Sequence, residues 1–182
     1  MKKFILSATV VLITFLSACQ KNNHDAKGGY GNLPRTKVPA ALQGNWMYGN
    51  FSMTEYWNQS PGDYLGNALQ YAIAFKFNAD GTYEQYFSSS SVSGGVATYQ
   101  QSVTKGTIEI DASTNKIITH AYSAHYKSSK NGQTLEERDM AQSELNGTTH
   151  YTYEAGQEPN GTNAIYLLMQ GTNSPLTFLQ KF

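Results

Sequence analysis

The sequence contains a single cysteine, Cys19, among its 182 residues. A chain with one cysteine forms no internal disulfide, so the folded domain must be stabilised by its core alone. Arginine is also scarce: Arg35 and Arg138 are the only two, which leaves few guanidinium groups to clamp phosphates or other anions. The formal net charge is +0, and the basic excess typical of nucleic-acid-binding domains is missing. These shortages argue against a disulfide scaffold, an anion clamp and a nucleic-acid-binding protein.

Sequence signatures of the common enzyme classes are missing as well. The chain has no Gly-x-Ser-x-Gly elbow, no phosphate-binding loop and no HExxH zinc motif. Glu136 and Glu137 are neighbours that would diverge on a helix or on a strand, so they make a poor acid/base pair. We therefore predict that the protein is not an enzyme and uses no cofactor.

The amino terminus has the three zones of a secretory signal. The basic pair Lys2 and Lys3 is followed by an apolar stretch over residues 4–15 and by small residues before Cys19. A transmembrane helix needs about 20 apolar residues, whereas this run is shorter and contains serine and threonine. Residues 1–18 are therefore predicted to be a cleaved signal peptide.

The residues Leu16-Ser17-Ala18-Cys19 resemble the lipobox of bacterial lipoproteins. The resemblance implies that the signal is cut before Cys19, that the thiol of Cys19 carries a diacylglyceryl thioether, and that its new amino group is acylated, as with palmitate. Two or three acyl chains make membrane anchoring effectively permanent. Because Gln20, and not aspartate, follows the cysteine, the resemblance favours the outer membrane of the bacterial cell envelope. An incidental cysteine in an ordinary cleaved signal is the alternative.

Residues 19–40 are predicted to be a lipidated flexible tether, and residues 41–182 a single domain. Glycines and prolines interrupt the polar residues after Cys19, and no apolar periodicity is present. A flexible coil of about 20 residues has a root-mean-square reach of roughly 25 Å. Loss of Lys2 and Lys3 with the signal leaves 11 basic residues against 13 acidic ones, so the mature chain still lacks a basic footprint.

The strongest local pattern is a β-hairpin over residues 71–87. Asn78-Ala79-Asp80-Gly81 fits a type I turn followed by a left-handed glycine, which sets Asn78 opposite Thr82. In that register the apolar pairs, Phe77 with Tyr83 and Ile73 with Phe87, share one face, and Lys76 meets Glu84 on the other.

Further strands are predicted from short runs rich in aromatic and β-branched residues, separated by Gly, Asn, Asp and Ser. With the hairpin, about eight strands follow one another along the chain. Sequential strands with short turns most simply make an all-β, antiparallel up-and-down barrel, which has no exposed edges. Residues 133–147 fit a helix and equally a polar edge strand. The other predicted strands span residues 45–53, 96–111, 116–127, 150–155, 163–170 and 176–182.

Alternation along residues 116–127 predicts which side chains share a face. One face carries Ile118, His120, Tyr122, Ala124 and Tyr126, and the other Thr119, Ala121, Ser123, His125 and Lys127. His120 and His125 would then point to opposite sides, and His150 opens a different strand. No metal site is predicted from this spacing.

A second resemblance comes from "LQGNW", residues 42–46, because a Gly-x-Trp element also opens the first strand of lipocalins. "FKFNADGTY", "GTIEID" and "NKIITHAY" follow in the order found in lipocalin-like domains of bacterial lipoproteins. The resemblance covers about residues 41–182. It implies a lipocalin-like barrel in which Trp46 plugs one end.

An eight-stranded barrel is filled by its own side chains or holds one small ligand. The 13 tyrosines and 8 phenylalanines suit an apolar cavity with hydroxyl groups that orient a ligand. We therefore predict a membrane-anchored lipoprotein that binds a small apolar or amphipathic molecule. The candidate cavity residues are Phe75, Phe77, Tyr83, His120 and Tyr122.

Residues 53–70 form the longest insertion between predicted strands and carry Tyr56, Trp57 and Tyr64. Such a segment suits a lid or contact loop at a barrel mouth, and a short helix packed over the open end fits it equally. The insertion supports an alternative function, in which a filled barrel docks a protein or glycan of the cell envelope through its loops.

Overall fold

The structure is a computed structural model that describes residues 29–50, 52–53, 56–58 and 69–181. The predicted signal peptide, Cys19 and Tyr64 lie outside these residues. The described residues form nine β-strands and three single-turn 3-10 segments, and none of them belongs to an α-helix. Within this part of the chain, no helix has the length and apolar character needed to cross a membrane.

The elements follow one another with short connections, apart from the stretch between β1 and β2. The 3-10 segments are η1 (Ala40–Leu42), η2 (Tyr56–Asn58) and η4 (Gln142–Glu144). The strands are β1 (Gly44–Tyr48), β2 (Leu69–Phe77), β3 (Thr82–Ser93), β4 (Val96–Asp111), β5 (Lys116–Lys130), β6 (Gln133–Asp139), β7 (Thr148–Gln157), β8 (Asn163–Met169) and β9 (Leu176–Lys181).

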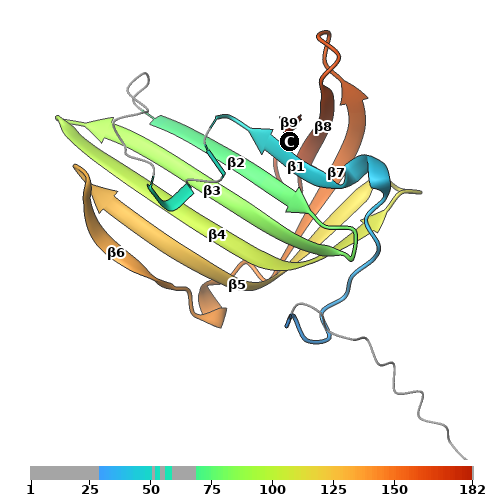
Figure 1. Ribbon diagram of the computed structural model, residues 1–182, viewed down its shortest axis with the longest axis horizontal. Coiled ribbons are helices and arrows are strands. Elements are labelled where there is room, and N and C mark those ends of the chain that lie inside the picture. Colours follow the sequence, from blue (N-terminus) through green and yellow to red (C-terminus); the bar gives the residue numbers. More distant parts are fainter. Residues whose placement is uncertain (1–28, 51, 54–55, 59–68, 182) are drawn as a thin grey trace, which may run out of the picture.

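The nine strands form one antiparallel sheet that closes in a ring (Figure 1). Around the ring the order is β1, β2, β3, β4, β5, β7, β8 and β9, and β9 pairs with β1. The pairing of β4 with β5 completes the ring, and β6 continues the sheet from the second half of β5. The prediction of an all-β fold of antiparallel strands is confirmed. The ninth strand is β6, in the segment for which helix and strand had both been possible.

The predicted β-hairpin is confirmed residue by residue. Phe77 pairs with Tyr83, and Lys76 pairs with Glu84. The amide of Asn78 donates to the carbonyl oxygen of Thr82 over 3.0 Å. Gly81 has a φ of +82°, the left-handed conformation that this turn requires and that glycine adopts without strain.

A β-bulge interrupts the pairing of β4 with β5. Lys105 pairs with Ser123, but the next residue, Gly106, pairs with Ala121, so Tyr122 has no partner in β4. One extra residue shifts the alternation of side chains by one position. A single alternation along β5 therefore does not tell which side chains face inward, because the alternation changes at Tyr122.

The bulge overturns the predicted faces of β5. Before the bulge the buried residues are Ile117, Thr119 and Ala121, at 1%, 3% and 7% exposure. Beyond it, Ala124 is buried at 4%. His120 lies between two inward residues and His125 follows Ala124, so both histidines face outward. Tyr122 is 44% exposed, and the prediction that His120 and Tyr122 share a face with Ala124 is wrong.

One end of the ring interior is filled by a packed apolar core. The indole nitrogen of Trp46 donates to the carbonyl oxygen of Leu42 over 2.8 Å, and the Trp46 side chain is 1% exposed. Val38 and Leu42, which precede β1, are part of this core. The other fully buried members are Phe75, Phe77, Tyr83, Ile108, Ile117, Ile165, Leu167 and Phe178.

The chain before η1 is hydrogen-bonded to the sheet. The amide of Thr36 donates to the carbonyl oxygen of Ile108 over 3.0 Å, and the Thr107 hydroxyl donates to the carbonyl oxygen of Pro34 over 2.7 Å. Val38 is 4% exposed. The last residues of the predicted tether, which was expected to run to residue 40, are thus part of the folded unit.

A second apolar cluster covers the outer face of β1–β4. Tyr56 of η2 packs there against Met47, Ala74 and Val103 and is 3% exposed. Its hydroxyl interacts with the carbonyl oxygen of Phe87 and accepts from the amide of Ser102 over 3.0 Å. η2 therefore fastens the β1–β2 connection to the outside of the ring.

The first prediction concerns Gly106, because the bulge leaves no room for a side chain at this position. A Cβ atom at this position would lie 1.9 Å from the carbonyl oxygen of His120. We expect Gly106→Ala to lower the free energy of unfolding by about 2–3 kcal/mol, since backbone must move to relieve the clash. Equilibrium urea denaturation measures the change.

The matched control is Gly147→Ala, where a Cβ would meet no atom within 4 Å. It should change the free energy of unfolding by less than about 0.5 kcal/mol. Equal stability of the two variants would contradict the close approach at Gly106.

Tyr56 gives a second prediction. Tyr56→Phe removes the hydroxyl that bonds to the backbone of β3 and β4, and the loss of such a hydrogen bond should cost about 0.5–1.5 kcal/mol of unfolding free energy. Thermal and urea denaturation should show the loss. The exposed Tyr122→Phe serves as the control and should be neutral; a neutral Tyr56→Phe would show that η2 is not fastened through this hydroxyl.

Candidate ligand cavity

The interior of the ring holds a cavity of about 480 Å³. It is built from β2, β3, β7, β8, β9 and the turn between β8 and β9. β2 contributes Tyr71, Ile73 and Phe75 at alternate positions, as expected for one face of a strand. The other lining residues are Gln85, Phe87, Tyr151, Leu167, Met169, Thr172, Asn173, Ser174, Leu176 and Phe178.

A smaller cavity of about 290 Å³ adjoins the first. The two share four lining residues: Gln85, Phe87, Tyr151 and Met169. The smaller cavity extends along the inner face of β3, β4 and β5 towards η4 and is more polar, with Ser102, Thr104 and Thr149 in its wall. Together they provide an apolar space with polar groups on one side.

Three hydroxyl groups meet at the boundary of the two cavities and the core. Thr119 forms side-chain hydrogen bonds with both Tyr83 and Tyr151. Burial raises the pKa of Tyr151 to about 12, an increase that the hydrogen bonds with Thr119 and Thr149 partly offset. Burial also raises the pKa of Tyr83 well above its usual range. Both phenols are therefore neutral at physiological pH.

Gln85 adds an amide to this polar side. It lines both cavities and is half-buried. No described residue supplies a hydrogen-bond partner for its side chain. The amide has two N–H donors and one carbonyl acceptor, so it can bind a ligand oxygen or hydroxyl.

The structure divides the predicted cavity residues into three groups. Phe75 lines the larger cavity and Tyr83 the smaller one. Phe77 is 2% exposed in the packed core and is not among the lining residues of either cavity. His120 and Tyr122, expected in the cavity, face outward because of the bulge.

The histidines on the outer face are engaged by carboxylates. His120 Nε2 lies 2.7 Å from Glu109 Oε1, and His125 Nδ1 lies 2.8 Å from Asp139 Oδ1. These pairs are separate from each other. In the described part of the chain, no group of three or more His, Cys, Asp or Glu side chains is placed to hold a metal ion.

Tyr56 and Trp57, predicted to form a lid or contact loop at the mouth, lie on the outer face of the sheet. Trp57 packs edge-on against Tyr56 and His125, with ring centroids 4.9 Å and 5.0 Å away. It borders an outer groove of about 700 Å³ together with Tyr86, Lys105 and other residues of β3–β6. Neither residue is among those that line the two inner cavities.

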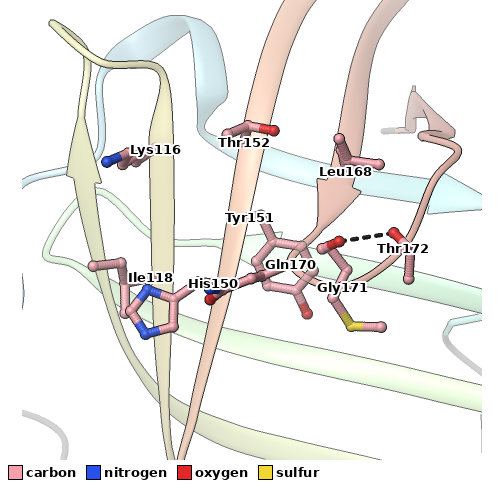
Figure 2. A pocket seen from close by; sticks show the side chains of 10 residues that line it. Lys116, Ile118, His150, Tyr151, Thr152, Leu168, Gln170, Gly171 and Thr172 are labelled. Carbon is pink, nitrogen blue, oxygen red and sulfur yellow. Dashed lines mark hydrogen bonds between the residues drawn. The ribbon is translucent and has the colours of Figure 1, made fainter.

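A further depression of about 340 Å³ lies at the ends of β5, β7 and β8 (Figure 2). Figure 2 shows His150 and Tyr151, neighbours on β7, on opposite sides of the strand. His150 lies beside Ile118, its partner in β5. The Thr172 hydroxyl donates to the carbonyl oxygen of Met169 over 2.7 Å and fixes the turn after β8. The alternation on β7 is thus what directs Tyr151 into the ring.

Several cavity residues were missed by the sequence analysis although a signal for them exists. The predicted hairpin register already placed Ile73, Phe87 and Gln85 on the face of Phe75. In β7, alternation from His150 puts Tyr151 and Tyr153 on one face. The β8 and β9 residues could not be assigned, because their short apolar runs do not indicate which face is inside.

Comparisons with known proteins do not assign the chain to a family. No protein-family model matches it, and no curated protein sequence matches it. The candidate site is therefore defined by its own geometry: an apolar cavity in a closed antiparallel sheet, with neutral hydroxyl and amide groups on one side.

Proposed function

We propose that the protein is a membrane-anchored, lipocalin-like lipoprotein whose barrel binds a small apolar or amphipathic molecule. The observation that supports the proposal is the larger inner cavity. Its volume of about 480 Å³ falls in the range of roughly 300–1,000 Å³ of small-molecule sites. A filled barrel would have left no such space beside the core around Trp46.

The lining of the cavity favours apolar ligands. Ile73, Leu167, Leu176 and Phe178 point into it, and burying apolar ligand surface against them gains about 25 cal/mol per Å². Tyr151 and Gln85 can orient a polar group of the ligand. An anchor at Cys19 would hold this binding domain at the surface of the bacterial envelope, with the outer membrane favoured by Gln20.

Docking of an envelope protein or glycan is the second candidate function. The observation in its favour is the outer groove, where Trp57 and Tyr86 lie beside charged side chains such as Lys105. This groove shares no lining residue with the larger inner cavity. If this candidate is right, Trp57→Ala abolishes capture of an envelope partner and leaves ligand binding in the cavity unchanged.

The cavity proposal is tested with N-phenyl-1-naphthylamine, a neutral apolar probe whose fluorescence rises when it leaves water. The full chain, made by cell-free synthesis without detergent, should bind the probe saturably. Met169→Trp places a large side chain in the wall shared by both cavities and should weaken binding about tenfold or more, which is about 1.4 kcal/mol.

Leu168→Trp is the matched control, because residue 168 alternates with Met169 and is not among the residues that line the two inner cavities. It should leave probe affinity unchanged. Probe binding that is absent, or that both variants weaken equally, contradicts a ligand site in the barrel.

The anchor is tested separately. Cys19→Ser should abolish lipidation and release the protein from bacterial membranes, as measured by fractionation and by the mass of the amino-terminal peptide. Ser7→Ala, within the apolar run, is the control and should remain membrane-bound. Membrane association of Cys19→Ser equal to that of the wild type would contradict a lipid anchor at this residue.

A further inference from the structure

The two inner cavities contain almost no charge. Among their described lining residues, Glu144 is the only one with a charged side chain. Arg138 holds this carboxylate in a two-pronged ion pair, with both N···O distances at 2.7 Å, and the amide of Ala141 donates to it over 2.7 Å. These bonds lower the pKa of Glu144 to about 2, so it is anionic at every ordinary pH.

The guanidinium nearest the cavities is already neutralised. Arg138 Nε also lies 2.5 Å from Glu136 Oε1, so two carboxylates surround one cation. An anionic ligand that reached the cavity would find no positive group among the described residues that line it, and it would meet the excess negative charge of Glu136 and Glu144. Burying an ion without a partner costs far more than burying a neutral polar group.

Apart from Glu144, the polar groups that line the two cavities are neutral. Tyr83, Thr119 and Tyr151 share hydrogen bonds, and the phenols stay protonated because burial raises their pKa values. The Gln85 amide is uncharged. A hydroxyl, carbonyl or ether oxygen of a ligand matches these donors and acceptors, and it requires no counter-charge.

Resting on the proposed ligand-binding function, we propose that the cavity selects uncharged amphiphiles, whose single oxygen function bonds to Tyr151 and Gln85, and rejects fatty acids and other anions of the same carbon skeleton. The hydrocarbon part lies against the apolar wall formed by residues such as Ile73 and Leu176. The selectivity for uncharged over anionic ligands comes from the neutral donors at the polar side and from the lack of a free cation among the described lining residues.

The test compares dodecan-1-ol with dodecanoate at pH 8, where the acid is ionised. Both are used to displace N-phenyl-1-naphthylamine from the full chain, below the concentrations at which they form micelles. The alcohol should displace the probe at a concentration at least about tenfold lower than the carboxylate. Equal potency, or a stronger effect of the carboxylate, overturns the inference.

Two variants locate the selectivity in the cavity. Tyr151→Phe should weaken dodecan-1-ol binding by about 3- to 10-fold, the range expected for one neutral hydrogen bond, and should weaken it more than it weakens binding of the probe. Gln85→Lys supplies the missing cation and should improve dodecanoate binding about tenfold or more. Tyr153→Phe, on the same strand but outside both cavity linings, is the control and should alter neither.

The outcomes separate the two proposals. If the wild-type chain does not bind the probe, the ligand-binding function fails and this inference fails with it. If the probe binds but alcohol and carboxylate compete equally, or Gln85→Lys leaves dodecanoate binding unchanged, only the inference about neutral ligands is overturned. Circular dichroism of each variant verifies that lost binding is not lost folding.

Discussion

The pairing of β4 with β5 is the contact on which the rest of the structure depends. It joins the first four strands of the ring to the last four and thereby creates an interior. The bulge in this pairing then determines what faces that interior. Because Tyr122 is the extra residue, Thr119 and Ala121 point inward while His120 stays outside with Glu109. The ring consequently encloses neutral hydroxyl groups and no imidazole of β5.

The ring is asymmetric from end to end, and this asymmetry produces a cavity instead of a uniform core. At one end, Val38 and Leu42 add apolar side chains to those of the strands, and Trp46 fills the space between them. At the other end, β2, β3, β4 and β5 extend beyond the residues that pair with β1 and β7, with β6 alongside (Figure 1). Fewer side chains meet there, so space remains between β2 and β8. Tyr56 packs on the outer face of the same sheet and is not among the residues that line the two inner cavities.

Turn residues and the alternation of apolar and polar side chains correctly predicted the parts of the fold that depend on residues close together in the chain. The hairpin from Tyr71 to Phe87 could be predicted because turn chemistry and alternation agree on one register, and the bounds of β4 coincide with the predicted residues 96–111. The bulge at Tyr122 could not be predicted, because it depends on the close approach of Gly106 to His120, a contact between two strands. β6 was ambiguous since all its residues are exposed, and an exposed strand has no apolar alternation. Without the bulge, sequence alternation assigned His120 and Tyr122 to the wrong face.

The distribution of polar groups also bears on how a ligand reaches its site. Thr119 and Tyr83 are 3% and 2% exposed, whereas Tyr71 in the cavity wall is 44% exposed, so the hydroxyl groups of Thr119 and Tyr83 lie deep in the ring. A ligand oxygen that bonds to these deep hydroxyl groups must leave water to reach them. For a neutral oxygen the lost hydration costs a few kcal/mol, and the hydroxyl and amide groups restore it; for an unpaired ion the cost is several times larger. The depth of the hydroxyl groups and the absence of a free cation thus act in the same direction, and both favour uncharged molecules.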